Sequence, residues 1–238
     1  MGAIAAALQA CQNRIASACN EAGRDEKCAR LVAVSKTFPA ASIREAYAAG
    51  QRIFGESYLQ EALPKMEQLA DLPLEWHFIG PIQSNKTRQI AAHFDWVHSV
   101  AREKIAQRLS EQRPAHMPPL NVCIQVNVSG EASKSGVAPE AALALANASS
   151  ALPNLRVRGF MAIPEPSHDA TLQHNRFRCV AELLQAARAS GLSLDTLSIG
   201  MSADLEIAIY AGSTLVRAGT AIFGVRPVIE NNQQEDAA

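Results

Sequence analysis

The sequence predicts an α/β protein, a single (β/α)8 barrel of the TIM type with an extra N-terminal helix. Three observations predict this fold. About eight short apolar segments alternate with helical ones, 238 residues are enough for one large domain or two small ones, and no change in composition marks a domain boundary. A doubly wound open sheet is the alternative arrangement of the same elements. We expect the barrel domain to span residues 1–228 and residues 229–238 to form a polar, disordered tail.

The extra helix is predicted over residues 3–22, ahead of the first strand. Apolar side chains recur there at helical spacing, and Gly23 follows as a stop signal. The apolar positions are Ile4, Leu8, Cys11, Ile15 and Cys19.

The remaining elements follow from alternating periodicities and from Gly and Pro at the boundaries. Strands are expected over residues 31–36, 52–55, 75–80, 94–98, 120–128, 155–161 and 194–199, with a last strand region over 214–218 and 221–223. Helices are expected over residues 39–49, 57–70, 84–93, 102–112, 139–151, 169–190 and 202–211.

Composition excludes several classes of protein. The formal net charge is -1, which gives no general attraction to nucleic acid or membranes, so any basic site must be local. The cysteines are odd in number and form no CxxC, which indicates reduced thiols in a cytosol-like compartment, with Cys11 and Cys123 as core residues. There is no signal-peptide pattern and no membrane-spanning stretch. Without GxGxxG or GxxxxGK[ST], dinucleotide and P-loop nucleotide sites lose their main support.

One lysine stands out at the end of the first strand. Residues 31–36 are an apolar run that ends in Lys36, and Pro39 then suits the first turn of a helix. Partial burial of an amine leaves more of its neutral, nucleophilic form. The alternative is a lysine whose ammonium group reaches solvent from the strand end.

Two glycine-containing stretches are candidates for holding a phosphate, because barrels of this type often bind phosphate after strands seven and eight. In residues 198–202, Gly200 allows close approach of the backbone and Ser202 is expected to cap a helix, which directs N–H groups towards an anion. In residues 217–220, Gly219 exposes backbone N–H and Thr220 adds a hydroxyl. The alternative is an ordinary helix cap and a glycine bend.

Arg217 lies within the apolar last strand, where a buried guanidinium keeps its charge and needs a partner. The partner is either an acidic side chain or an acceptor on a ligand. A lysine at a strand end, a phosphate cradle and a buried arginine together indicate a phosphorylated aldehyde bound as a Schiff base. Pyridoxal 5'-phosphate (PLP) matches all three, with its aldehyde at Lys36, its phosphate at the two glycine stretches and its ring nitrogen at Arg217.

The sequence resembles the pyridoxal phosphate homeostasis proteins, single-domain relatives of the alanine racemase barrel. The matching stretches run in order along nearly the whole chain. They are AVSKT (33–37), FGE (54–56), WHFIGPIQSNK (76–86), SKSG (133–136), GFMAIP (159–164), SIGMS (198–202) and VRAGTAIFG (216–224).

The resemblance implies a PLP aldimine at Lys36, a cytoplasmic location and a role in buffering or delivering PLP without established turnover. Apo forms of PLP-dependent enzymes are the recipients that such a role implies. We expect a monomer, because no long apolar surface stripe is left unassigned. One departure concerns Ser57, where the family usually has asparagine, and a hydroxyl cannot make both amide hydrogen bonds.

Further candidates are weaker. His77 lies on a strand and either lines the ring pocket or is a hydrogen-bonded core histidine, and Met161 packs against the ring or in the core. Lys134 is a solvated loop lysine or a second acceptor of PLP, and His168 and His174 show no metal-site spacing with a third ligand. The full set of expected cofactor contacts is Val34, Lys36, Ser57, His77, Met161, Ser198, Gly200, Met201, Ser202, Arg217, Gly219 and Thr220.

Two enzymatic alternatives share this predicted site. A low-activity amino-acid racemase needs a second acid or base, for which Tyr58, Tyr210 or Lys134 would have to serve. An arginine at the ring nitrogen disfavours transamination and decarboxylation, because it keeps that nitrogen unprotonated and weakens the ring as an electron sink. A Schiff-base aldolase acting on a sugar phosphate uses the lysine and phosphate sites but does not need Arg217.

Overall fold

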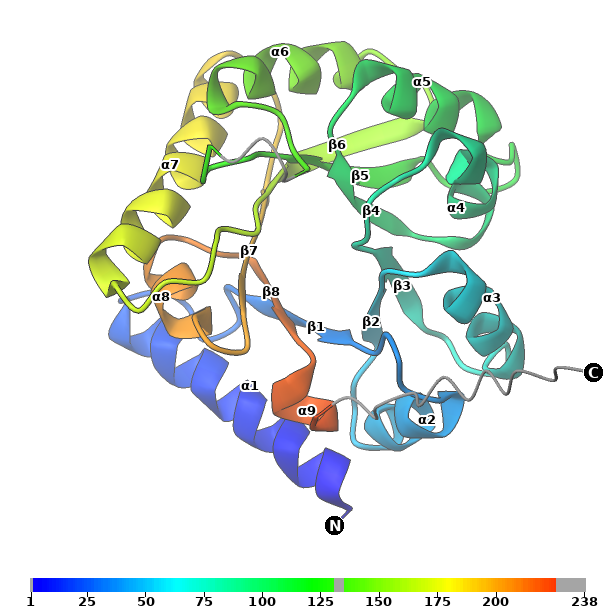
Figure 1. Ribbon diagram of the computed structural model, residues 1–238, viewed down its shortest axis with the longest axis vertical. Coiled ribbons are helices and arrows are strands. Elements are labelled where there is room, and N and C mark those ends of the chain that lie inside the picture. The colour runs from blue at the N-terminus through cyan, green and yellow to red at the C-terminus, as the bar shows by residue number, and fades with distance from the viewer. Residues whose placement is uncertain (1, 131–134, 226–238) are drawn as a thin grey trace, which may run out of the picture.

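Within the described residues, eight strands form one closed parallel barrel in the order β1 to β8, which confirms the predicted (β/α)8 fold over the open sheet (Figure 1). The computed structural model describes residues 2–130 and 135–225. The strands are β1 (Arg30–Val34), β2 (Ile53–Glu56), β3 (Glu75–Phe78), β4 (Trp96–Val100), β5 (Leu120–Gln125), β6 (Leu155–Met161), β7 (Thr196–Met201) and β8 (Leu215–Ala218).

Helices follow the strands and surround them on the outside (Figure 1). After the N-terminal α1 (Ala3–Glu21), they are α2 (Ala40–Ala48), α3 (Leu59–Gln68), the 3-10 turn η1 (Ser84–Lys86), α4 (Thr87–His93), α5 (Glu103–Gln112), α6 (Pro139–Ser150), α7 (Ala170–Ala189), α8 (Leu205–Tyr210) and α9 (Thr220–Phe223).

Closure of the barrel brings the first and last strands together. Val32 on β1 pairs with Arg217 on β8, and Val34 pairs with Gly55 on β2. In a parallel barrel the carboxyl ends of all strands open at the same mouth. Lys36, two residues beyond β1, therefore shares a mouth with the segments that follow β7 and β8.

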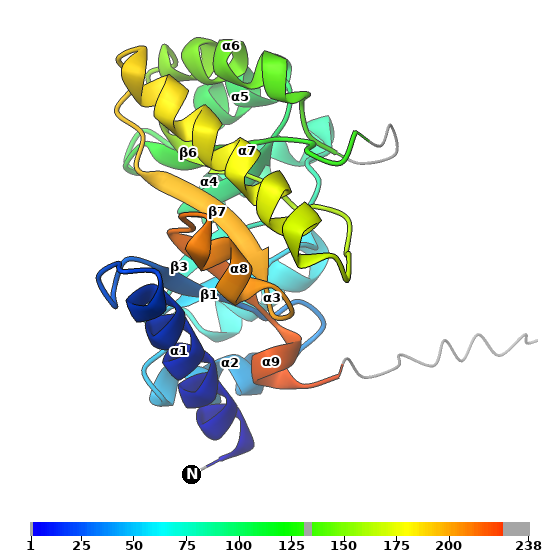
Figure 2. The same cartoon turned by 90° about the vertical axis from the view of Figure 1, so that its left-hand side faces the viewer.

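The predicted N-terminal helix is present as α1 and lies outside the barrel's own repeat. It packs against α2, α8 and α9, and Figure 2 shows it running beside α8 and α9. Its buried positions include Leu8, Cys11, Ile15 and Cys19, as its periodicity predicts. Gly23, with φ of 66°, adopts the left-handed conformation that suits the end of a helix.

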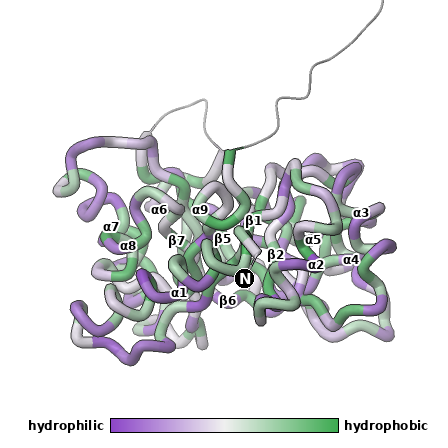
Figure 3. Tube along the Cα trace, turned by 90° about the horizontal axis from the view of Figure 1, so that it is seen from below, coloured by the Kyte–Doolittle hydropathy of each residue, from purple (hydrophilic) through white to green (hydrophobic). Residues whose placement is uncertain are grey.

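The core has two parts. Figure 3 shows hydrophobic and hydrophilic stretches alternating along the chain that builds them. The larger lies between the strands and the surrounding helices, as alternation along the strands predicts. The smaller consists of Val32, Trp96, Cys123, Met161 and Leu215, and their positions on the strands place it in the barrel interior. Cys11 and Cys123 are buried, as expected.

Three expectations about local structure are wrong. Residues 221–223 belong to α9 rather than to the last strand, which ends at Ala218. Helix α8 begins at Leu205 with Asp204 in the cap position, so Ser202 does not cap it and lies instead in the preceding turn. Strand β5 ends at Gln125 instead of residue 128, and an isolated bridge joins Val126 to Val137 beyond it.

Some expectations concern residues that the structure does not describe. These are the polar tail over residues 229–238 and Lys134. Among the helices of the described part, none combines the length and the apolar character that a membrane crossing requires.

Candidate functional site

A cavity of about 310 Å³ opens at the carboxyl ends of β1, β7 and β8. This is the mouth at which (β/α)8 barrels carry their functional sites. Eight of the predicted site residues line it, together with Ile79, Ile163 and Ala203. The eight are Val34, Lys36, Ser57, Met201, Ser202, Arg217, Gly219 and Thr220.

Lys36 lies in the turn between β1 and α2, half-buried at the edge of this cavity. Its Nζ atom is 5.9 Å from the centroid of the Tyr58 ring. The next residue, Thr37, has φ of 69°, a conformation that a β-branched side chain rarely adopts. Such backbone strain persists only where the surroundings impose it, so the turn that carries Lys36 is held firmly.

A buried polar cluster holds the turn in place. Glu56 Oε1 accepts hydrogen bonds from Ser35 Oγ at 2.7 Å and from Lys65 Nζ at 2.8 Å, and Lys65 also donates to the carbonyl of Ser35. Glu61 accepts from the backbone N–H of Thr37. Burial raises the pKa of Glu56, and the positive charge of Lys65 opposes that shift. Both residues flanking Lys36 are thereby fixed by side chains from β2 and α3.

Arg217 projects from β8 into the barrel and is almost fully buried. Its Nη1 donates to the carbonyl and the hydroxyl of Ser198, and its Nη2 donates to the carbonyl of Ala162. Burial lowers the pKa of Arg217 to about 10, with the charge of Asp204 acting in the opposite direction. These three bonds all go to neutral oxygens, so the guanidinium presents a positive charge to the cavity.

The two glycine stretches meet across the cavity. Gly219 precedes α9, and a side chain there would approach the carbonyl oxygen of Val34 to 3.1 Å, so its small size allows β8 to lie close to β1. On the other side, the backbone N–H of Met201 is bound by Asp204 Oδ1 at 2.6 Å. Ser202 and Thr220 bring hydroxyl groups to the lining.

Gly200 lies behind the cavity, where β7 packs against α8. It does not line the cavity, and a side chain added there would come within 2.4 Å of the Ala208 Cβ atom. Its φ of 91° also favours glycine. Close packing of α8 against β7 therefore requires glycine here, and its predicted contact with the cofactor stays a prediction.

Three other predicted contacts lie in the barrel interior and not in the lining of the cavity. His77 and Ser198 are fully buried and hydrogen-bonded, and Met161 belongs to the small interior core. His77 and Met161 are buried as their core alternatives expect, and their contacts with the cofactor ring stay predictions. Ser198 touches the site indirectly, through Arg217.

Sequence reasoning did not identify the groups that support the site. Lys65 looks like a solvent-facing helix residue, and only its position opposite Glu56 in space reveals a buried ion pair. His98, Ala162 and Asp204 were also missed. The sequence does hold a signal for the histidine pair. His77 and His98 lie on neighbouring strands, and both fall on the face that points into the barrel.

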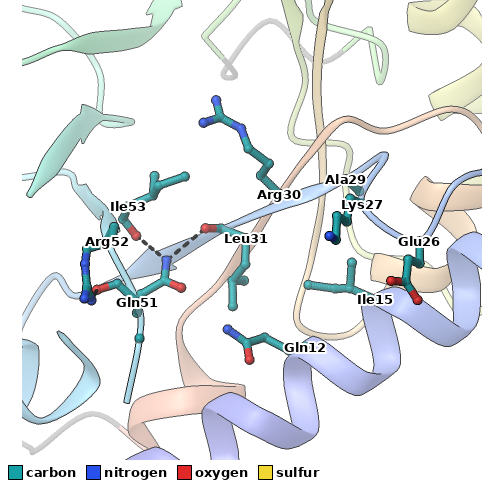
Figure 4. Close-up of a pocket in the computed structure, with 11 residues that line it drawn as sticks. Gln12, Ile15, Glu26, Lys27, Ala29, Arg30, Leu31, Gln51, Arg52 and Ile53 are labelled. Atoms are coloured by element: carbon teal, nitrogen blue, oxygen red, sulfur yellow. Dashed lines mark hydrogen bonds between the residues drawn. The ribbon is translucent and has the colours of Figure 1, made fainter. Parts of the chain in front are cut away.

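A second cavity, of about 340 Å³, lies at the opposite end of β1 and β2, beside α1 (Figure 4). The side-chain amide of Gln51 donates there to the carbonyls of Leu31 and Ile53, which satisfies backbone groups at the strand starts. Figure 4 shows Arg30 turned away from Gln12 and Ile15. Within residues 2–130 and 135–225, no cluster of His, Cys, Asp and Glu could hold a metal ion.

Comparison with known proteins places this arrangement in a family. The model of the alanine racemase N-terminal domain matches residues 7–227. The pyridoxal phosphate homeostasis protein of Pseudomonas aeruginosa is 64% identical over 226 residues, which cover 95% of this chain and 97% of that protein. The protein of the same name from Escherichia coli K12 is 50% identical over 229 residues, covering 95% and 98%.

A solved structure agrees. PipY of Synechococcus elongatus, determined with PLP bound, has a TM-score of 0.77 and 39% identity, covering 83% of this chain and 93% of that one. The alanine racemase of Corynebacterium glutamicum, at 20% identity and a TM-score of 0.66, shares the fold. With the family model matching nearly the whole barrel and relatives this similar over their full length, the chain belongs to the pyridoxal phosphate homeostasis proteins of the alanine racemase N-terminal domain family.

Proposed function

We propose that this protein binds PLP in the cavity at the mouth of the barrel and takes part in intracellular PLP homeostasis as a carrier, without catalytic turnover. The observation that carries the proposal is the convergence of Lys36, Arg217 and Thr220 on one cavity of about 310 Å³. A relative that is 39% identical has PLP bound, which supports the same ligand here.

The residues fit this cofactor. The buried guanidinium of Arg217 can donate to the ring nitrogen. Its three hydrogen bonds to the protein go to two carbonyl oxygens and one hydroxyl, and none of them goes to a carboxylate. Ser202, Gly219 and Thr220 would hold the phosphate with hydroxyl and backbone N–H groups. The PLP aldehyde condenses with an unprotonated amine, forming a C=N bond and releasing water. Lys36 is the amine that the cavity presents.

The surroundings of Lys36 that the structure describes support the carrier role. Racemisation needs a second acid or base on the other face of a bound amino acid. Tyr210 lies on α8, where its hydroxyl binds Glu21, and it does not line the cavity. Tyr58 is near Lys36 but about half of it is exposed to solvent. A water-exposed phenol provides poor control over proton transfer, so we assign no catalytic role.

Tyr58 nevertheless makes racemisation the second candidate, because its ring centroid lies 5.9 Å from Lys36 Nζ. Incubation with single L-amino acids and chiral analysis separates the two roles. Repeated turnover that is lost in Tyr58→Phe supports the racemase, whereas no D-isomer supports the carrier.

The binding proposal is tested by visible absorbance of the purified protein with added PLP. The wild type should show the band of a lysine-bound PLP, and Lys36→Ala should lose it. Lys104→Ala is the matched control, since Lys104 is exposed on α5 away from the cavity. An unchanged band in Lys36→Ala would overturn the proposal.

The proposal has further parts: the recipients of released PLP, the cytoplasmic location and the monomeric state. Sedimentation tests the monomeric state.

A further inference from the structure

A line of hydrogen bonds, buried except at its Glu75 end, crosses the barrel from one mouth to the other. Arg217 Nη1 donates to Ser198 Oγ, which is 2.8 Å from His98 Nδ1. His98 Nε2 is 2.8 Å from His77 Nδ1, and His77 Nε2 is 2.7 Å from Glu75 Oε1. We call this line the interior relay; its members are Glu75, His77, His98, Ser198 and Arg217.

The two ends of the relay meet different surroundings. Arg217 lines the cavity in which we place PLP. Glu75 lines a hollow of about 430 Å³ at the opposite mouth, and its Oε1 atom lies 3.7 Å from Arg30 Nη1. Lys27, Arg158 and Asp195 also line this hollow. The middle members of the relay are completely buried; they are His77, His98 and Ser198.

The chemistry of the ends fixes the direction of every bond. A guanidinium can only donate and an ionised carboxylate can only accept. With Glu75 ionised, His77 must carry its proton on Nε2 and accept at Nδ1. His98 must then do the same, and the hydroxyl of Ser198 must donate to it. The lone pairs of Ser198 Oγ are therefore turned towards Arg217.

Burial keeps the two imidazoles neutral. It lowers the pKa of His77 well below its usual value, with the charge of Arg30 acting in the same direction. The pKa of His98 is lowered as well, by burial first and then by the charges of His77, Arg217 and Arg30. Neutral rings each have one donor and one acceptor, so the relay stays fully satisfied.

We propose that the interior relay positions Arg217 and couples the charge of Glu75 to the cavity at the other mouth. If Glu75 loses its charge, its hydrogen can point to His77 Nε2 and the relay can reverse. Ser198 Oγ then faces donors from both His98 and Arg217, and its hold on the guanidinium weakens. His77, His98 and Ser198 are positioning residues here, since they reach the cavity only through Arg217. The effect on PLP rests on the proposed function.

The direction of the relay can be measured without PLP. Long-range ¹H–¹⁵N NMR of the imidazoles, assigned with His77→Gln and His98→Gln, should show both rings neutral and protonated at Nε2 at pH 7. Glu75→Gln, whose amide can donate or accept, should shift the Nδ1 and Nε2 resonances of both rings. Asp195→Asn is the control, because it removes a carboxylate from the same hollow outside the relay. A ring protonated at Nδ1, or unchanged shifts in Glu75→Gln, would overturn the proposal.

The coupling to the cavity is measured by PLP titration. Glu75→Gln should raise the dissociation constant about threefold to tenfold, the size expected for one weakened buried hydrogen bond. In a Ser198→Ala background, the same substitution should have no further effect, because the relay is already cut. Additive effects, or equal losses in Asp195→Asn, contradict the coupling. If the wild type binds no PLP, the proposed function fails and the NMR result still decides the relay.

Discussion

Lys65 Nζ lies 2.8 Å from Glu56 Oε1, and this buried pair also binds the backbone next to Lys36 through the carbonyl of Ser35. Glu56 is inaccessible to solvent, and its second carboxylate oxygen has no hydrogen-bond partner among the described residues. A charge in such a place is stable only while its partner remains. The pair therefore links the stability of the barrel to the geometry of the proposed PLP site.

Removing one partner should be costly. Lys65→Met leaves the Glu56 carboxylate buried and unpaired, which should lower the free energy of unfolding by about 3–5 kcal/mol at pH 8. Urea denaturation followed by circular dichroism measures it. The double variant Glu56→Gln with Lys65→Met should regain most of this loss, and a double variant less stable than the single one contradicts this account of the pair.

The same variant has a predictable pH dependence. Burial raises the pKa of Glu56 in the folded state, so this group binds its proton more tightly when folded. Stability then falls as pH rises from the unfolded pKa through the folded one. Without Lys65 the shift should grow, and the deficit of Lys65→Met should be smaller at pH 5 than at pH 8. An equal deficit at both pH values would contradict a raised pKa of Glu56 in the variant.

The buried histidines should make the protein sensitive to mild acid. The folded pKa values of His77 and His98 are depressed, so below about pH 6.5 the unfolded chain binds more protons than the folded one. Each ring then lowers the free energy of unfolding by up to about 1.4 kcal/mol per pH unit as pH falls through this range. His98→Gln should show a shallower fall between pH 6.5 and 5 than the wild type. Parallel curves would contradict the assignment of both rings as neutral.

Gly159 on β6 should tolerate no side chain. A Cβ atom there would lie 1.8 Å from the carbonyl oxygen of Thr196 on β7, and its φ of 155° is unfavourable for other residues. Gly159→Ala should lower the free energy of unfolding by more than about 3 kcal/mol or prevent folding. Gly191→Ala is the control, since its position is open and only its φ of 95° opposes a side chain, at about 1 kcal/mol. Thermal unfolding of both variants decides.

The fold was predictable because it depends on repeated local patterns. Alternating strand and helix periodicities, with glycine and proline between them, indicate a (β/α)8 barrel without any knowledge of side-chain contacts. The errors lie at element ends. The residues 221–223 are apolar enough for a strand, but β8 has already ended, and the chain turns into α9 after Gly219.

The site was predictable where function depends on strand ends. Lys36, Ser202 and Thr220 fall at the carboxyl ends of their strands, so the barrel itself brings them together. The supporting shell was not predictable, because Lys65 and Glu56 meet only through the packing of α3 on β2. The same holds for His98 and Ser198, which are 100 residues apart in the chain.

The central claim is that Lys36 carries the cofactor. Reduction of the PLP-loaded protein with borohydride, followed by peptide mass spectrometry, tests it most directly, because reduction makes the bond permanent at the residue that formed it. The account predicts the pyridoxyl phosphate adduct on the peptide that contains Lys36. An adduct confined to another lysine, or no adduct at all, would contradict it.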